Sequence, residues 1–159
     1  MQNNRIIRKC TEDDKSAFVR LNLEFMREVM ASNPYWAKLN QPSAEELGSV
    51  FMEALTRPEN IQIFCAEVNG EVAGYANTWT VYSIWSGGMA LTVDDLYIAL
   101  PFRGRGIGED IMKYLINHAE RHNFKRIQLH AEPDNHRAHS LYRKLKFQKE
   151  AMFYFMKLI

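Results

Sequence analysis

The sequence of 159 residues lacks an excess of one charge, carries two cysteines and has no long apolar run. Its 20 Lys and Arg residues against 19 Asp and Glu give a net charge of +1, which argues against a dedicated binder of nucleic acid or of an anionic membrane. Cys10 and Cys65 lie in apolar segments without a CxxC partner, so we expect buried free thiols in a reducing compartment, with a disulfide or a catalytic cysteine as alternatives. No stretch approaches the roughly 20 apolar residues of a membrane-spanning helix, and residues 1–9 lack the apolar run of a signal peptide. We expect a soluble cytoplasmic protein that does not engage a membrane.

The composition predicts one globular domain over residues 1–159. Hydrophobic residues make up 47% of the chain and charged residues 25%, which is ordinary for a folded protein and excludes a disordered one. No repeat, low-complexity stretch or linker divides the sequence. A chain of this length buries roughly 70% of its unfolded surface, so it needs neither a metal nor a disulfide to fold.

Hydrophobic periodicity predicts an α/β domain (α+β in some schemes) with a mixed, mostly antiparallel sheet and flanking helices. Ser43 with Glu46 forms a capping box at a helix start, and Asn69-Gly70 is a hairpin turn signal. The predicted order is β-α-α-β-β-β-α-β-α-β. The strands are predicted at 5–10, 61–68, 71–81, 89–98, 127–131 and 148–158, and the helices at 11–33, 43–56, 106–120 and 136–145.

A glycine-rich loop lies between the strand over 89–98 and the next helix. Gly104, Gly106 and Gly108 allow the backbone to turn with its N–H groups converging, and the helix start adds a partial positive charge. Arg103 and Arg105 add full charges. This combination suits a pyrophosphate group.

Other readings of the loop fit less well. A P-loop requires Gly-Lys-Ser/Thr at its end, whereas Glu109-Asp110 follows the last glycine here. A dinucleotide fingerprint requires G-x-G-x-x-G, whereas these glycines are spaced G-x-G-x-G. A flexible turn with no ligand is the remaining alternative.

The loop resembles a known motif. Arg103-x-x-Gly106-x-Gly108 is similar to the R/Q-x-x-G-x-G/A motif with which the GCN5-related N-acetyltransferase (GNAT) family binds the pyrophosphate of acetyl-CoA. Downstream, residues 135–147 resemble the family's N-x-x-A-x-x-L/F-Y-x-K-x-G-F pattern, except that Lys146 stands where the family has glycine. Two motifs in the right order make the resemblance specific, and the order of elements fits the family fold over nearly the whole chain.

The resemblance implies an acyltransferase that moves an acetyl group from acetyl-CoA to a primary amine by direct transfer in a ternary complex. Tyr142 would be the general acid that protonates the CoA sulfur, although a tyrosine at this helical spacing is also typical of a core. Asn135 would contact the CoA arm, or cap a helix. The residues that the resemblance assigns to acetyl-CoA are Leu96, Tyr97, Ile98, Arg103, Gly104, Arg105, Gly106, Ile107, Gly108, Glu109, Asn135, Arg137, Ala138 and Tyr142.

The amine side is less well defined. Asp94 and Asp95 lie in an otherwise apolar strand, where carboxylates are costly unless the site is wet or cationic. This stretch resembles the diamine and polyamine (spermidine/spermine) branch of the family, in which Asp94 would be the catalytic base or the group that binds the amine. Tyr82 and Trp85 would contact the substrate by cation–π interaction, or simply pack.

Other candidates have no motif to support them. Glu24, Glu28, Tyr35 and Trp36 lie in the first helix and the loop after it, where the family's substrate identity is determined. His118 with His122 shares a helix face but does not form HExxH, so we expect solvated histidines and no metal.

Alternative functions remain open. The acceptor could be a protein lysine, a protein N-terminus or an aminoglycoside, and a domain that binds acyl-CoA without catalysis is the alternative from another class. The resemblance also implies a homodimer, and the aromatic residues 153–155 of the predicted last strand could serve an interface or the core.

Overall fold

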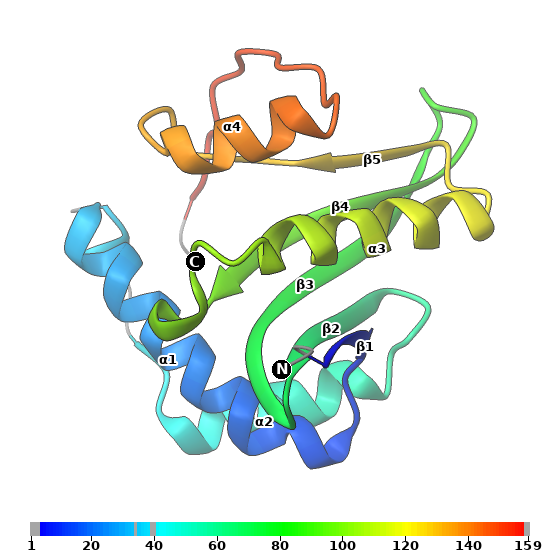
Figure 1. The fold of residues 1–159 in the computed structure, drawn as a ribbon. Helices are drawn as coiled ribbons and strands as arrows, with labels where there is room; N and C mark the ends of the chain where they lie inside the picture. Colours follow the sequence, from blue (N-terminus) through cyan, green and yellow to red (C-terminus); the bar gives the residue numbers. More distant parts are fainter. Residues whose placement is uncertain (1–3, 34, 39–40, 158–159) are drawn as a thin grey trace.

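The computed structural model describes residues 4–33, 35–38 and 41–157 and contains a five-stranded sheet in the order β1-β2-β3-β4-β5. Strands β1 to β4 pair antiparallel, and β4 pairs parallel with β5, so the sheet is mixed as predicted (Figure 1). The strands are β1 (Arg5–Lys9), β2 (Ile61–Val68), β3 (Glu71–Ser83), β4 (Gly88–Ile98) and β5 (Arg126–Leu129).

The helices form a layer on each face of the sheet. They are α1 (Lys15–Ser32), α2 (Ala44–Leu55), α3 (Ile107–Arg121) and α4 (His136–Lys144), with short 3-10 turns at Glu12–Asp14, Trp36–Lys38 and Leu100–Phe102. One buried cluster joins α1 and α2 to the sheet, and a second joins α3 and α4 to its other face (Figure 1). In the described part of the chain, every helix is too short or too polar to cross a membrane.

The local sequence signals form the structures that they predict. The backbone N–H of Ser43 donates to the Glu46 carboxylate at 2.7 Å, and the Glu46 N–H donates to the Ser43 hydroxyl at 3.2 Å, which completes the capping box of α2. Asn69 and Gly70 have φ values of 53° and 85°, the left-handed pair that a type I′ hairpin turn requires. Cys10 and Cys65 are buried free thiols, as expected.

Strand β4 contains a bulge at Asp94. Asn77 of β3 pairs with Asp95 and Thr78 pairs with Val93, so Asp94 has no partner residue on β3. An extra residue changes which face of the sheet the following side chains occupy.

The bulge moves the side chains at the end of β4 to the opposite face of the sheet. Val93 packs in the cluster under α3, whereas Tyr97 packs in the cluster under α1, although an unbroken alternation would put both on one face. Asp95 lies two residues before Tyr97 and therefore shares the α1 face. The bulge thus turns a carboxylate and a phenol toward α1.

Strands β4 and β5 separate beyond Val93. Their pairing covers only 90–93 of β4 and 126–129 of β5, while β4 continues to Ile98. In the described residues, the edge of β4 over 94–98 therefore has no strand on the β5 side. This open edge lies beside the glycine-rich loop, which follows β4 through the Leu100–Phe102 turn.

The predicted last strand is wrong for the described residues 148–157, which form no strand; its final residue, Leu158, lies outside the described residues. Met152, Phe153 and Phe155 are exposed instead of forming part of the core. A strand needs a neighbour to accept its backbone hydrogen bonds, and β5 at the sheet edge is only four residues long. Aromatic β-propensity alone does not replace that partner.

The prediction for the histidine pair is also partly wrong. His118 is buried, with its ring 5.3 Å from that of Phe64, because the helix face that carries it packs on the sheet. His122 lies one turn further, where its Nδ1 is 2.8 Å from the backbone carbonyl of His118. Burial lowers the pKa of His118 to about 4, helped by the nearby His122, so this ring is neutral at pH 7.

Candidate active site

The glycine-rich loop takes backbone conformations that other residues adopt only with strain. Gly104 has a φ of 79°, and Gly106, the N-cap of α3, has a φ of 80°. A Cβ added at Gly104 would meet no atom within 4 Å, so the loop surface is open there. The glycines thus supply the turn into α3 and leave space above it.

The loop presents a run of free backbone N–H groups. The N–H of Arg103 donates to the Leu100 carbonyl at 3.3 Å, and that of Asp110 donates to the Gly106 carbonyl at 3.1 Å. Between these two, the N–H groups of residues 104–109 have no backbone acceptor in the described chain. Free N–H groups at a helix start, with the partial positive charge of the helix, form an anion-binding site.

Charged side chains frame this run. The guanidinium of Arg105 lies 5.5 Å from the centre of the Phe102 ring. The Glu109 carboxylate is bonded by Lys113 at 2.8 Å and by Lys144 at 2.6 Å, and these partners lower its pKa to about 2. Because the two lysines neutralise the Glu109 carboxylate, it does not repel an anion at the loop. The backbone N–H of Glu109 remains available to bind that anion.

Arg5 ties the loop to the far end of the sheet. From β1 it forms an ion pair with Asp110 and donates to the carbonyl of Arg105 at 2.9 Å. Residues 5 and 105 are too distant in the sequence for any motif to connect them. Sequence reasoning therefore missed this residue.

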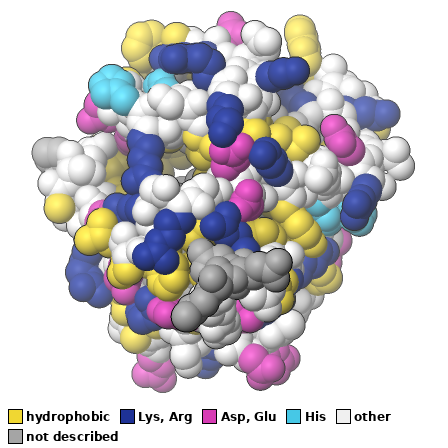
Figure 2. Space-filling view, viewed as in Figure 1, with side chains coloured by type: hydrophobic (Ala, Val, Ile, Leu, Met, Phe, Trp, Pro, Cys, Tyr) yellow, Lys and Arg dark blue, Asp and Glu magenta, His cyan; other side chains and the backbone are white. Residues whose placement is uncertain are grey.

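On the face that Figure 2 shows, Lys and Arg side chains are spread among acidic and hydrophobic ones. The mixture agrees with the net charge of +1. The two signs of charge are thus intermixed on the face that this view shows.

The open edge of β4 provides the second part of the site. Leu96 and Ile98 pack in the cluster under α3, and Tyr97 packs under α1, so all three leave backbone groups at the edge. The Ile98 carbonyl already accepts a hydrogen bond from Arg103 Nε at 2.7 Å. An extended ligand can add to such an edge as a strand does.

Arg103 does not point into the run of free N–H groups. Its Nη2 donates to both carboxylate oxygens of Glu28, at 2.9 and 2.8 Å, and its guanidinium lies 5.2 Å from the centre of the Tyr97 ring. The Tyr97 hydroxyl donates to the same carboxylate at 2.8 Å and lies 3.5 Å from that of Glu24. The structure thus brings two acids of α1, proposed from the sequence without a motif, to the end of β4.

The remaining two residues of that group lie further along the chain. Tyr35 packs against Trp36 with ring centres 5.4 Å apart, and the Trp36 Nε1 donates to the Glu132 carboxylate at 3.3 Å. The loop after α1 therefore reaches the segment before α4.

Tyr142 is held by the end of α4. Lys146 has a φ of 64°, its N–H donates to the Arg143 carbonyl at 3.0 Å, and the Phe147 N–H donates to the Tyr142 carbonyl at 3.0 Å. These two bonds define a Schellman motif, in which the residue after the turn packs on the last helical turn. Accordingly, the rings of Tyr142 and Phe147 lie 5.8 Å apart. Burial raises the pKa of Tyr142, so its hydroxyl keeps its proton at neutral pH.

Asp94 and Asp95 have different surroundings. Asp94 is exposed at the bulge, whereas Asp95 is partly buried on the α1 face. Burial, with repulsion from Asp94, raises the pKa of Asp95 to about 6, and hydrogen bonding to Asn77 only partly offsets these effects. A carboxylate with this pKa exchanges protons near neutral pH.

Tyr82 and Trp85 do not lie beside these carboxylates. Both are exposed near the tip of the β3–β4 hairpin, where Tyr82 pairs with Met89. Tyr82 lies five residues along β3 from Asn77, the partner of Asp95, which is about 17 Å at about 3.4 Å per residue. Within one copy of the chain, the aromatics and the acids do not form one site.

Two residues at the start of α4 were expected to contact acetyl-CoA. The Asn135 side chain caps the helix by accepting from the Ala138 N–H at 3.1 Å, which is the structural alternative foreseen for it. Arg137 is exposed in the first turn of α4. Neither position conflicts with contact to a ligand along the loop.

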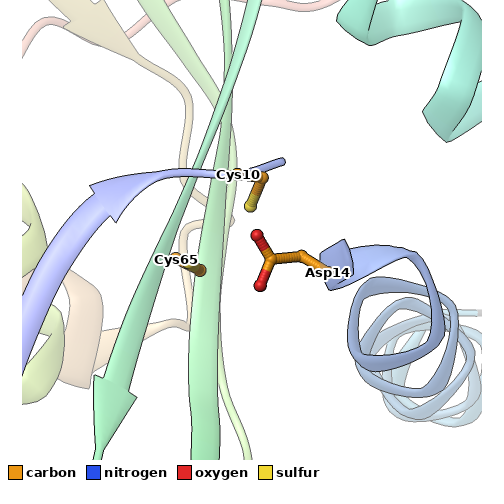
Figure 3. A group of neighbouring side chains, drawn as sticks. All are labelled: Cys10, Asp14 and Cys65. Carbon is orange, nitrogen blue, oxygen red and sulfur yellow. The ribbon is translucent and has the colours of Figure 1, made fainter. Parts of the chain in front are cut away.

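One group of side chains has the composition of a metal site. The ligand atoms of Cys10, Asp14 and Cys65 lie within 4.8 Å of one another. Figure 3 shows these three side chains. However, both Asp14 oxygens accept from Arg8, at 2.7 and 2.9 Å, so a cation would have to compete with a guanidinium. Hydrogen bonding to Cys65 and burial raise the pKa of the Cys10 thiol, which keeps it protonated. The group therefore fits a buried structural cluster better than a metal centre.

The fold and the site have two distinctive features: the fourth strand separates from the fifth, and this opening lies beside a helix start with free N–H groups. Together they are typical of acyltransferases. The acetyltransferase (GNAT) family matches residues 23–147, and the chain belongs to this family. It is an acetyltransferase of the GNAT type.

Individual relatives agree with this assignment. An uncharacterised N-acetyltransferase of Archaeoglobus fulgidus is 27% identical over 139 residues, which is 86% of this chain and 88% of that protein. The structure of a "possible acetyltransferase" from Clostridium difficile 630 superposes with a TM-score of 0.80 at 18% identity, covering 98% of each chain. An aminoglycoside acetyltransferase from an uncultured soil sample, solved with sisomicin, superposes with a TM-score of 0.76 at 16% identity, covering 98% of this chain and 97% of that one. At these identities the two structures support the fold and not a substrate.

Proposed function

We propose that this acetyltransferase uses acetyl-CoA and transfers its acetyl group directly to a primary amine of a small polycationic molecule of the diamine or polyamine type. The observation that carries the proposal is the run of free N–H groups over 104–109 at the start of α3, beside the open edge of β4. A polyanionic cofactor with an extended arm matches both features.

The residues present fit acetyl-CoA. The N–H groups of 104–109 and the Arg105 guanidinium would hold the pyrophosphate, and the β4 edge over 96–98 would hold the pantetheine arm. A Cβ would be strained at Gly104 and Gly106, which keeps the backbone accessible to phosphate oxygens. When bound, acetyl-CoA supplies a thioester whose acyl carbon accepts the amine and whose sulfur leaves as a thiolate.

We assign proton movement to Asp95 and Tyr142. The family resemblance gave the base role to Asp94, and we move it to Asp95 because Asp95 is the partly buried carboxylate of the two. A primary amine of the lysine type has a pKa near about 10, so it arrives protonated and must lose a proton before it attacks. Asp95, with a pKa of about 6, accepts a proton at neutral pH, directly or through a water. Tyr142 keeps its proton at Oη and can donate it to a leaving thiolate.

Asp94 is the group that we assign to binding the amine. It is exposed at the bulge next to Asp95, so an incoming ammonium meets its carboxylate before reaching the partly buried one. Together with Glu24 and Glu28 at Tyr97, these acids favour an acceptor with more than one positive charge.

An amine panel tests the proposal and separates the acceptor classes. Putrescine, spermidine, sisomicin and a lysine-containing peptide would each be incubated with acetyl-CoA, and free CoA thiol would be measured. Turnover with spermidine or putrescine is the expected result. Turnover with sisomicin alone would show that the acceptor is an aminoglycoside. Turnover with the peptide alone would show that it is a protein lysine. Binding of acetyl-CoA without turnover on any amine would indicate a non-catalytic acyl-CoA sensor.

A further inference from the structure

Glu28 occupies a position between the cofactor loop and the acids of the acceptor side. From α1 its carboxylate accepts from the Tyr97 hydroxyl at 2.8 Å and from Arg103 at 2.9 and 2.8 Å. Its side chain is still 47% exposed, so one side of the carboxylate faces solvent. Glu28 can therefore exchange one cationic partner for another without unfolding its surroundings.

Arg103 is anchored through its Nε, which donates to the Ile98 carbonyl at 2.7 Å, and its Nη2, bonded to Glu28, is the nitrogen for which an anion at the loop would compete. Arg103 directly precedes the free N–H groups of 104–109, yet its guanidinium is turned back to Glu28. A single nitrogen, Nη2, contacts both Glu28 oxygens, so the pair is not the two-nitrogen fork that makes Arg–carboxylate pairs strong. Partly exposed pairs contribute little to stability, and a pyrophosphate offers an arginine more negative charge.

We propose that Glu28 is shared between Arg103 and the acceptor amine, so that binding of the CoA pyrophosphate increases the affinity for a cationic acceptor. The inference rests on the proposed function. In the free protein Arg103 neutralises Glu28. When the pyrophosphate draws Arg103 toward the loop, the Glu28 carboxylate is left without its guanidinium and binds an ammonium group.

The surroundings of Glu28 strengthen this exchange. The Glu24 carboxylate lies 3.5 Å from the same Tyr97 hydroxyl, and Asp95 lies on the same face of β4. Arg20 stays 3.4 Å from Glu24, so once Arg103 has moved the carboxylate left without a guanidinium is that of Glu28, and its negative charge attracts a cation to this face. By linkage, the factor by which CoA tightens amine binding equals the factor by which the amine tightens CoA binding, and such factors are typically about 5- to 150-fold.

The first test measures CoA affinity by calorimetry in wild type and Glu28→Gln, and it needs no acceptor. Removing the charge that holds Arg103 is expected to tighten CoA binding several-fold. Glu53→Gln is the matched control, because it also removes a carboxylate that pairs with an arginine, Arg57, but it lies on α2, away from Tyr97 and the loop. The control is expected to leave CoA affinity unchanged. Unchanged or weaker CoA binding in Glu28→Gln, with thermal stability retained, would overturn the inference.

The second test measures spermidine binding with and without saturating CoA. In wild type, CoA is expected to lower the spermidine Kd by about five-fold or more, and in Glu28→Gln the two values are expected to coincide. A role that is only structural would change the melting temperature and leave this ratio intact. Equal spermidine affinity with and without CoA in wild type, or no spermidine binding in either state, would contradict the inference.

Failure of the inference and failure of the proposed function give different results. A protein that does not bind CoA contradicts the proposed function itself. A protein that binds CoA and acetylates an amine, but shows neither effect of Glu28→Gln, contradicts the shared carboxylate alone.

Discussion

Tyr142 and Phe147 lie on either side of the turn that ends α4, with their ring centres 5.8 Å apart. The turn exists because Lys146 takes a left-handed conformation with a φ of 64°. The position of the proposed acid is therefore set by backbone geometry four residues after it, and this connects a departure from the family motif to the chemistry of the site.

The Lys146→Gly variant should be more stable than wild type. Glycine adopts a positive φ without a Cβ penalty, so the expected gain is about 0.5–1 kcal/mol, or a rise of about 1–4 °C in melting temperature. Thermal unfolding measures the change. Lys149→Gly, at an exposed position outside the left-handed region, is the control and should not be stabilised. Loss of stability in Lys146→Gly would show that the lysine side chain itself supports the turn.

The Tyr142→Phe variant should lose turnover while it keeps its cofactor. A positioned general acid contributes about 10²- to 10⁴-fold, so kcat is expected to fall at least about 100-fold. The ring of phenylalanine preserves the contact with Phe147, and calorimetry should therefore give an unchanged Kd for CoA. Full activity in this variant would assign Tyr142 to the core and not to the reaction.

The Asp95→Asn variant should be inactive but more stable at high pH. The folded-state pKa of Asp95, about 6, lies above its usual value of 3.8. The protonated Asp95 side chain therefore contributes its full stability below pH 4, and this contribution is lost as the pH rises through 6. Removing the charge should raise the free energy of unfolding at pH 8 by up to about 2–3 kcal/mol and leave it nearly unchanged at pH 4.

Asp94→Asn is the matched control for this comparison, because Asp94 is the exposed neighbour. It removes only the repulsion that Asp94 exerts on Asp95, so at pH 8 it should raise the free energy of unfolding by less than Asp95→Asn does, and at pH 4 it should change that free energy by less than about 0.5 kcal/mol. Denaturation at the two pH values measures both variants. An effect of Asp95→Asn that is equal at pH 4 and pH 8 would show that its carboxylate titrates in the folded state as it does in the unfolded chain.

The Gly106→Ala variant should weaken CoA binding by at least about 10-fold, since the strain of about 1–2 kcal/mol for a left-handed alanine is relieved only by moving the N–H groups of the loop. Gly70→Ala is the control. Gly70 has a φ of 85° and no atom within 4 Å of its Cβ position, where a Cβ at Gly106 would meet only Arg5 Nη1 at 3.9 Å, but Gly70 lies in the β2–β3 turn. Both variants should be destabilised to a similar degree, and only Gly106→Ala should lose CoA affinity. Equal CoA affinity of the two variants would show that the loop does not bind the cofactor.

Much of the fold could be predicted because its signals are local. The Ser43 capping box, the Asn69-Gly70 turn and the glycine-rich loop each depend on neighbouring residues, and each formed as expected. Periodicity then located the four helices and the five strands that the described residues contain. Lys146 stands where the family motif has glycine, and it takes the left-handed conformation that glycine favours at a helix end.

Other features could not be predicted because they depend on contacts distant in the sequence. The pairs of Arg5 with Asp110 and of Glu28 with Arg103 join residues 105 and 75 positions apart. The bulge at Asp94 is not marked by a glycine, so nothing in the local sequence shows that the residues after it change faces. The last strand was wrong because the aromatic pattern of 148–158 says nothing about whether a partner strand is long enough.

The most direct measurement is a titration of isotopically labelled protein with CoA, followed by the NMR signals of backbone amides. The free N–H groups of residues 104–109 carry the proposed cofactor site. These amides are predicted to shift most, together with those of 96–98 on the open edge of β4, and residues 83–88 at the hairpin tip should not respond. Binding of CoA that shifts the hairpin tip or α2 and leaves 104–109 unchanged would contradict the assignment.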